Sequence, residues 1–168
     1  MIHKTKFEVE SIYILRGRKC VMVELKEITK DNYDDVLKLK VAKNQENFVS
    51  TVVQSLAQAW VYRNTAYPFV IYEDNTSVGF IMLGYYELKK QFTLWKLMID
   101  EQYQNKGYGK KALKLAINWL VNNFNVKEVY AGVAYENPIA ENLYYSVGFR
   151  KTGDSDELQF EMKLIIED

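Results

Sequence analysis

The stretch Gln104-Asn105-Lys106-Gly107-Tyr108-Gly109 is the most informative part of this sequence. It follows the apolar run 94–99 and precedes residues 110–123, where apolar side chains recur at helical spacing, so we expect a strand, a glycine turn and a helix. Glycine permits a sharp bend and lets a ligand approach the backbone. The free amides at the start of the helix would then bind a phosphate or pyrophosphate, although a plain strand-to-helix turn explains the same pattern.

Two common phosphate motifs do not match this stretch. A Walker loop needs Gly-Lys-Ser or Gly-Lys-Thr, whereas Gly109 is followed by Lys110-Lys111-Ala112. A dinucleotide fingerprint needs three glycines in an early strand-helix unit, and this turn has two and lies past mid-chain. The pattern that remains is Gln-x-x-Gly-x-Gly between a strand and a long helix.

A second segment of interest is Asn137-Pro138-Ile139-Ala140-Glu141-Asn142-Leu143-Tyr144-Tyr145-Ser146-Val147-Gly148-Phe149. Pro138 suits the first turn of a helix, and Gly148 suits its end. On structural grounds alone, Asn137 would cap this helix and Tyr144 would fill the core.

Together, in this order and at this separation, the two segments resemble the acyl-CoA loop and the following helix of the GNAT family of N-acetyltransferases. The resemblance covers roughly residues 22–166. The family often has glycine where this chain has Asn105, and asparagine tolerates the left-handed conformation well. The resemblance implies an α/β (α+β) three-layer GNAT fold. Its mixed, mostly antiparallel central sheet would have about six to seven strands, a splayed central parallel pair and helices on both faces.

The resemblance also implies how a site would work. Acetyl-CoA, as co-substrate, would lie between the strands at 92–99 and 128–133, and the acetyl group would pass directly to an amine through a tetrahedral intermediate. Tyr144 matches the family's general acid, which protonates the departing thiolate. Amides of the glycine turn would hold the pyrophosphate, and Asn137 would contact the cofactor arm. The cofactor-binding residues predicted in this way are Leu97, Met98, Ile99, Gln104, Asn105, Lys106, Gly107, Tyr108, Gly109, Lys110, Asn137 and Tyr144.

Composition limits the remaining possibilities. The 168 residues suit one domain, and 22 basic against 22 acidic residues argue against nucleic acid or a membrane surface as the main partner. No run approaches the ~18 apolar residues of a membrane span. Cys20 is the only cysteine, which suits a reducing cytoplasm. His3 is the only histidine, which argues against a Ser-His-Asp or Cys-His site and against a His-rich metal centre, so no metal is expected.

Apolar patterning predicts the other elements. We expect residues 1–21 to be an N-terminal extension with room for one extra strand, and residues 22–168 to be a single N-acetyltransferase domain. Thr29 is the expected N-cap of the first helix, and Phe48, Val52, Leu56 and Trp60, with Val49 and Val53 beside them, form the expected buried stripe of the second. The strands are predicted at 23–28, 69–72, 78–85, 92–99, 128–133 and 158–166, and the helices at 29–39, 46–63, 110–123 and 138–147.

An amine acceptor raises a proton problem. An aliphatic amine with a pKa of about 10 is only about one part in a thousand neutral at pH 7, which corresponds to ~4 kcal/mol. A carboxylate or a water chain must take the proton, since the core holds no histidine. The sequence does not choose among the acids that could serve by position, which are Glu46, Glu73, Asp100, Glu101 and Glu136.

Segments 47–59, 68–72 and 78–80 look like the bacterial spermine/spermidine acetyltransferases within the family. A polycation needs spaced carboxylates, and the acids expected to border the acceptor cleft are Asp31, Asp34, Asp35, Glu46 and Glu73, of which Glu46, Asp34 and Glu73 are the predicted substrate contacts. An alternative interpretation of Asp31, Asp34 and Asp35 is that they complement a helix dipole on a solvated face. Other acceptors stay open, namely another small amine, an aminoglycoside, an amino acid or a protein N-terminus. A non-catalytic CoA-binding module, a structural interaction domain and a homodimer stay open as well.

Overall fold

The structure, a computed structural model, describes the backbone of residues 11–16 and 19–167 and the side chains of Ser11 and residues 21–167. It contains one eight-stranded sheet with the order β1-β2-β3-β4-β5-β6-β8-β7. The strands are β1 (Ser11–Arg16), β2 (Lys19–Glu27), β3 (Ala66–Glu73), β4 (Thr76–Tyr86), β5 (Gln91–Ile99), β6 (Glu128–Ala134), β7 (Arg150–Ser155) and β8 (Gln159–Ile165). The helices are α1 (Tyr33–Leu37), α2 (Val52–Val61), α3 (Tyr108–Phe124) and α4 (Pro138–Val147), with short 3₁₀ turns η1 (Lys43–Gln45) and η2 (Glu101–Tyr103).

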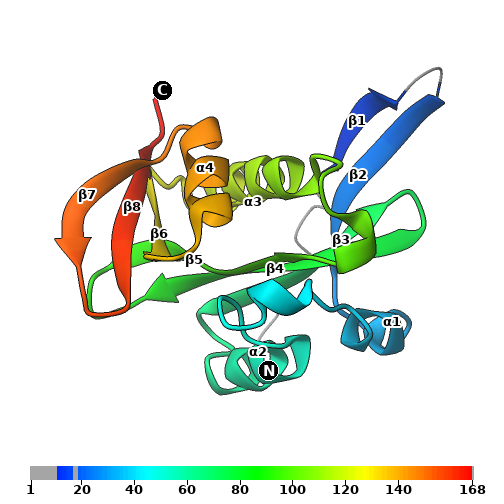
Figure 1. The fold of residues 1–168 in the computed structure, drawn as a ribbon, viewed down its shortest axis with the longest axis horizontal. Coiled ribbons are helices and arrows are strands. Elements are labelled where there is room, and N and C mark those ends of the chain that lie inside the picture. The colour runs from blue at the N-terminus through cyan, green and yellow to red at the C-terminus, as the bar shows by residue number, and fades with distance from the viewer. Residues whose placement is uncertain (1–10, 17–18, 168) are drawn as a thin grey trace.

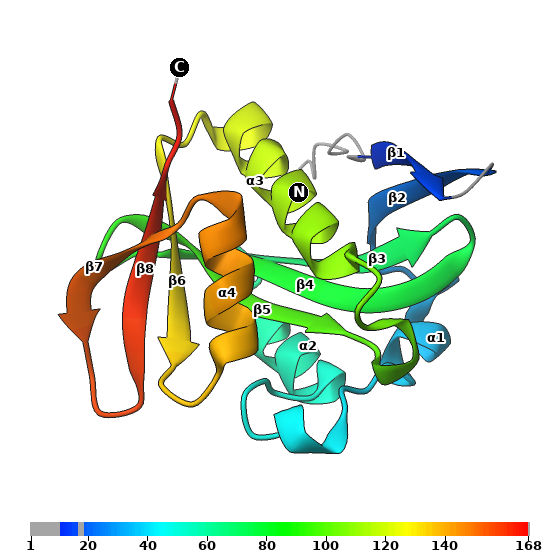
Figure 2. The ribbon, with the colours of Figure 1, turned by 45° about the horizontal axis from the view of Figure 1, so that its top comes forward.

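The expected three-layer architecture is confirmed. Helices α3 and α4 cover one face of the sheet, and α1 and α2 cover the other (Figure 1, Figure 2). Each face has its own apolar core. Trp119 and Leu113 belong to the core under α3, whereas Val36, Val52 and Phe80 belong to the core under α1 and α2. The β5–β6 pair is parallel and the other neighbouring strands are antiparallel, so the sheet is mixed and mostly antiparallel.

The sheet has two strands beyond the six that apolar patterning predicts. Strand β7 was missed because all six of its residues are exposed, so no buried face imposes alternation on the sequence. Strand β1 comes from the expected N-terminal extension and pairs with β2 from residue 19 onward. The expected boundary at Met22 therefore falls inside β2. Whether residues 22–168 fold and work alone stays a prediction.

The splayed parallel pair is also confirmed. Strands β5 and β6 are in register only at Thr93–Tyr130 and Leu94–Ala131. Directly beyond, Trp95 is an extra residue in β5, since Lys96 pairs with Met82 and Leu94 pairs with Leu83 on β4. A bulge of this kind bends a strand and increases its twist. The edge of β5 that faces β6 therefore has no partner strand in the described chain from Trp95 to Ile99.

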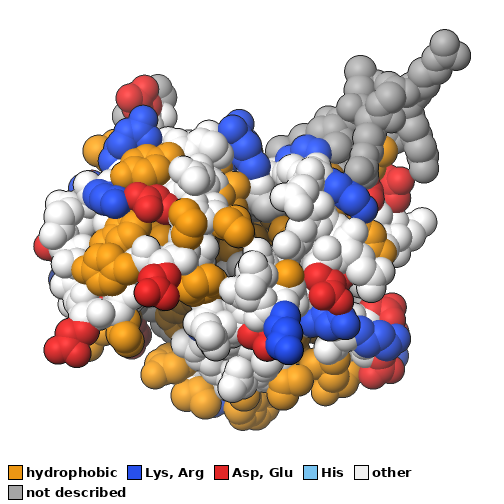
Figure 3. Space-filling view, viewed as in Figure 1, with side chains coloured by type: hydrophobic (Ala, Val, Ile, Leu, Met, Phe, Trp, Pro, Cys, Tyr) orange, Lys and Arg blue, Asp and Glu red, His pale blue; other side chains and the backbone are white. Residues whose placement is uncertain are grey.

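The second predicted helix starts later than the sequence suggested. A capping box begins α2, in which Thr51 Oγ1 accepts from the Gln54 amide at 3.2 Å and Gln54 Oε1 accepts from the Thr51 amide at 3.0 Å. Residues 46–50 precede the helix and do not extend it, so the expected stripe is wrong in part. Val52 is buried, but Trp60 is 73% exposed. Figure 3 shows apolar side chains gathered along the edge that α2 forms, and the large exposed ones on this helix are Val53, Trp60 and Val61.

The first predicted helix is shorter than expected. Thr29 does not cap α1, because its hydroxyl accepts from the Asp31 amide at 3.2 Å within a turn and Asn32 precedes the helix. The acids Asp34 and Asp35 lie in the exposed first turn of α1, and Asp35 forms an ion pair with Lys38 at 2.9 Å. Helices α3 and α4 match their predicted positions closely.

Candidate functional site

The glycine turn has the predicted left-handed geometry at two positions. Asn105 has φ 61° and Gly107 has φ 81°, and Gly107 directly precedes α3. Gly109 does not have a positive φ, since it lies in the first turn of the helix. A β-carbon at Gly109 would stand 3.4 Å from Leu143 Cδ2, which is an ordinary contact. Within this turn, backbone conformation therefore requires glycine at position 107 only.

The start of α3 has the properties of an anion site. The first amides of a helix have no partner within it, and here Tyr108, Gly109 and Lys110 supply them. A β-carbon at Gly107 would meet only the end of the Lys111 side chain, with Nζ 3.9 Å away. The space in front of the turn is therefore open and has a cationic group beside it. These donors fit a diphosphate.

The side chain of Gln104 is already engaged within the protein. Its Nε2 donates to the Ile99 carbonyl at 3.0 Å and to Gln45 Oε1 at 2.7 Å. This amide nitrogen connects the end of β5 to η1, so Gln104 could contact a cofactor through its backbone or its Oε1 but not through Nε2. Sequence reasoning missed Gln45, because a single glutamine in an irregular segment carries no pattern.

The cofactor-binding residues predicted on β5 are Leu97, Met98 and Ile99, and they lie along its open edge, where the GNAT resemblance implies that the pantetheine amides of acetyl-CoA pair with the backbone. Met98 packs into the core under α1 and α2, while Leu97 and Ile99 pack against the core under α3. With their side chains on the two faces, these residues present backbone groups toward the space that β6 has left. An extended ligand with amide groups could pair there in the manner of an added strand. That pairing stays a prediction.

Tyr144 lies on α4 with its ring in the core under α3. The residue is 7% exposed, and its ring packs against Phe149 at a centroid distance of 5.6 Å. Burial raises the pKa of Tyr144 to about 12, and no hydrogen bond reaches its hydroxyl from the described residues. The core-filling interpretation is thus correct for the ring. The hydroxyl therefore stays protonated at neutral pH, and its role as a proton donor stays a prediction.

Asn137 caps α4 as the simpler interpretation predicted. Its Oδ1 accepts from the Ala140 amide at 3.1 Å. Because the cap uses the oxygen, the Nδ2 group remains available to a ligand. Contact between Asn137 and a cofactor arm stays a prediction.

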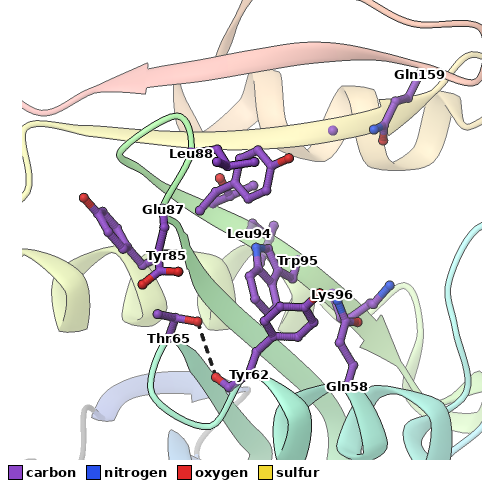
Figure 4. A pocket seen from close by; sticks show the side chains of 13 residues that line it. Gln58, Tyr62, Thr65, Tyr85, Glu87, Leu88, Leu94, Trp95, Lys96 and Gln159 are labelled. Carbon is purple, nitrogen blue, oxygen red and sulfur yellow. Dashed lines mark hydrogen bonds between the residues drawn. The ribbon is translucent and has the colours of Figure 1, made fainter.

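A pocket of about 580 Å³ opens on the α2 face of the sheet, at the point where β5 leaves β6 (Figure 4). Gly132 of β6 and Trp95 of β5 face it across the parting strands, and α2 contributes Gln58. The pocket has an aromatic character because four tyrosine or tryptophan rings line it. The complete lining is Gln58, Tyr62, Thr65, Tyr85, Tyr86, Glu87, Leu88, Thr93, Leu94, Trp95, Lys96, Gly132 and Gln159.

The acids predicted to bind substrate lie elsewhere. Asp34 is on α1, Glu46 is exposed just after η1, and Glu73 is at the end of β3, and none of them lines the pocket. Among the described residues that line it, Glu87 is the only acid. Glu87 follows β4 in a turn, where the sequence offered no signal to select it.

Two of the candidate bases, Asp100 and Glu101, are engaged in contacts within the protein. Asp100 is buried, and its carboxylate accepts from the amides of Lys40 at 3.1 Å and Gln102 at 3.0 Å. Glu101 forms an ion pair with Lys40 at 2.9 Å. Glu136 is exposed and, like these two, does not line the pocket. The structure therefore places none of the five predicted bases in the pocket wall.

Comparison with known proteins decides the family. The model of the Acetyltransferase (GNAT) family matches residues 24–149. The chain belongs to the GNAT family. A GNAT relative, the spermine/spermidine N(1)-acetyltransferase of Bacillus subtilis (strain 168), is 33% identical over 143 residues, which cover 80% of this chain and 91% of the relative. This GNAT chain is therefore an N-acetyltransferase, and enzymes of the family use acetyl-CoA.

Solved structures show the same GNAT fold. The crystal structure of spermidine N-acetyltransferase from Vibrio cholerae in complex with CoA and spermine has a TM-score of 0.68 at 17% identity, covering 85% of this chain and 95% of that one. A dodecameric structure of spermidine N-acetyltransferase from Vibrio cholerae has a TM-score of 0.54 at 21% identity, covering 67% of this chain and 72% of that one. Within the described residues of the GNAT chain, no helix is long and apolar enough to span a membrane.

Proposed function

We propose that this GNAT enzyme transfers the acetyl group of acetyl-CoA to a primary amine of a polyamine such as spermidine or spermine. The substrate class is supported by the Bacillus subtilis relative, which is named for spermine and spermidine. It is also supported by the aromatic lining of the pocket. The faces of Tyr62, Tyr85 and Trp95 suit the ammonium groups of a polyamine, and Glu87 supplies a carboxylate for one of them.

The observation that carries the proposal is the position of the pocket at the parting of β5 and β6. The pocket lining includes Leu94, the last residue of β5 in register with β6, and Trp95 and Lys96, the first two residues of the open edge. An acceptor in the pocket would thus meet an acyl donor that lies along residues 97–99. Acetyl-CoA supplies an acetyl group activated by its thioester.

The chain's own residues would bind the donor and stabilise charge. The amides of Tyr108, Gly109 and Lys110 hold the diphosphate at the start of α3. A backbone N–H on the open edge of β5 donates to the carbonyl oxygen, where negative charge develops as the amine attacks and the tetrahedral intermediate forms. Fixed donors of this type need no rearrangement during the reaction.

Tyr144 would act as the general acid. When the carbon–sulfur bond breaks, the sulfur leaves as a thiolate, and the Tyr144 hydroxyl gives it a proton. A thiol in water has a pKa of about 8.5, well below that of buried Tyr144. The apolar surroundings that raise the pKa of the phenol also raise the pKa of the departing thiol, so the difference between the two pKa values becomes smaller.

An amine panel tests the proposal. Purified enzyme is incubated with labelled acetyl-CoA and separately with spermidine, spermine, an aminoglycoside, amino acids and a peptide with a free N-terminus. Transfer to spermidine or spermine is the expected result. Transfer only to another acceptor would overturn the substrate class, and tight acetyl-CoA binding without any transfer would point to a non-catalytic module.

Two further expectations accompany this proposal. Self-association, with a homodimer as its simplest form, is supported by the dodecameric Vibrio cholerae structure, and light scattering on the purified chain tests it. The exposed apolar side chains of α2 provide positions to substitute if the chain self-associates. A cytoplasmic location is supported by the single cysteine, and fractionation of cells tests it.

A further inference from the structure

Two charged side chains line the pocket, and they have opposite signs. Glu87 lies in the turn between β4 and β5, and Lys96 lies on β5 beyond the bulge. Figure 4 shows them toward opposite sides of the pocket, with Trp95 and Tyr62 between them. The lining that connects the two charges is neutral and partly aromatic.

The bulge explains why Lys96 faces the pocket. Because Trp95 is the extra residue, Trp95 and Lys96 both face the α2 side of the sheet, whereas Leu94 and Leu97 pack on the α3 side. The Lys96 Nζ donates to Ser50 Oγ at 3.1 Å. No carboxylate of the described residues forms an ion pair with it, and burial lowers the pKa of the Lys96 ammonium. The titratable groups that share the lining with it are Tyr62, Tyr85, Tyr86 and Glu87.

The two charges are separated along β5. Strand β5 begins at Gln91, next to the turn that contains Glu87, and Lys96 is five residues further. At about 3.3 Å per residue, the backbone distance from Gln91 to Lys96 is roughly 16 Å. An acceptor that spans both ends must therefore be elongated. Lys96 directly follows Trp95, the first residue of the open edge of β5, and transfer would occur along that edge.

A fixed cation beside the reacting end would change the protonation of an amine. A nearby like charge disfavours the charged form, so the pKa of an ammonium next to Lys96 falls. A carboxylate has the opposite effect, so an ammonium next to Glu87 keeps its proton. This arrangement addresses the missing base, because an amine with a lowered pKa releases its proton to water without a neighbouring carboxylate.

We propose that Lys96 promotes the neutral form of the reacting amine while Glu87 holds the distal ammonium of the same acceptor. This inference rests on the proposed function. The polyamine would then enter in one direction, with a nucleophilic end at the open edge of β5 and a charged end at the β4–β5 turn. Lys96 acts through electrostatics and forms no bond with the substrate.

The test is the pH dependence of kcat with saturating spermidine and acetyl-CoA, because kcat reports ionisations in the bound complex. Lys96→Gln removes the charge and keeps a group able to donate to Ser50, Lys96→Arg keeps the charge, and Lys114→Gln on the outer side of α3 is the matched control. We expect the acidic limb of the kcat profile to move to higher pH in Lys96→Gln and to stay in place in the other two variants. For each pH unit that this limb moves, kcat at pH 7 should fall about tenfold. An acidic limb that stays in place in Lys96→Gln overturns the role of Lys96.

Glu87→Gln tests the other end, with exposed Glu157→Gln as its control. We expect a higher KM for spermidine with little change in kcat, and no effect on a simple alkyl monoamine. Equal effects on both amines overturn the role of Glu87. If wild-type enzyme acetylates another amine and not spermidine or spermine, the proposed function fails, and the same profiles measured with the reacting amine decide the inference. No transfer to any amine overturns both.

Discussion

The indole ring of Trp95 lies against the backbone of Gly84, so closely that a β-carbon at position 84 would overlap three atoms of the ring. Trp95 is the bulge residue of β5, and its ring also meets Tyr62 edge-on at a centroid distance of 5.7 Å. One side chain thus connects β4, the bulge and the end of α2. The absence of a side chain at Gly84 therefore makes room for the indole ring of the bulge residue.

Gly84→Ala should therefore destabilise the enzyme. We expect the free energy of unfolding to fall by about 1–3 kcal/mol, as for other overpacked sites, and KM for the amine to change because Trp95 lines the pocket. Urea denaturation measures the first effect. In a Trp95→Ala background the same substitution should cost much less, and an equal cost in both backgrounds would contradict the contact as its cause.

Tyr144→Phe should separate chemistry from binding. The ring stays in the core and the hydroxyl has no hydrogen bond from the described chain, so stability and the thermal shift caused by acetyl-CoA should persist. Loss of a general acid should lower kcat by about 100-fold or more. The neighbouring exposed Tyr145→Phe is the control and should keep full activity. Retained turnover in Tyr144→Phe would remove Tyr144 from the mechanism.

The raised pKa of Tyr144 predicts a pH-dependent stability. Folding raises this pKa from about 10 to about 12, so the folded state holds the proton between these values while the unfolded state loses it. Stability from this group is complete below pH 10 and falls as the pH rises toward 12. At pH 11 wild-type enzyme should have lost roughly 1 kcal/mol more than Tyr144→Phe, each relative to pH 8. Denaturant unfolding at both pH values measures it, and parallel losses would show that the hydroxyl is not shielded from water.

Two substitutions at Gly107 should separate backbone strain from access to the anion site. Gly107→Ala places a β-carbon at φ 81° and should cost about 1–2 kcal/mol of stability. Gly107→Asn tolerates that conformation better but adds a larger side chain in front of the amides. Both should reduce the thermal shift caused by acetyl-CoA, and Gly107→Asn should be the more stable protein. An undiminished shift in both would place the diphosphate elsewhere.

Much of the fold can be predicted from the sequence, because many helices and strands bury one face or have characteristic residues at their ends. Helix α4 has a proline at its start and Gly148, at φ 115°, at its end, and both were interpreted correctly. Strand β7 has no buried side chain, and its position depends on pairing with β8. The start of α2 was missed although the Thr51–Gln54 capping box was present in the sequence.

The candidate site also contains some residues that local sequence motifs reveal and others that only the fold reveals. The turn around Gly107 and the position of Tyr144 follow from local motifs, so the sequence identified them. Gln45, Glu87 and Lys96 owe their positions to contacts between distant segments and to one extra residue in β5. A bulge shifts the faces of the residues that follow, and simple alternation cannot reveal it.

The open edge of β5 also matters when acetyl-CoA is scarce. Unpaired strand edges offer their N–H and C=O groups to other chains, which is a route to aggregation. With the proposed pairing of acetyl-CoA along residues 97–99, the co-substrate would cover this edge as well as react there. Purification and storage with coenzyme A should therefore keep this protein dispersed for longer than buffer alone.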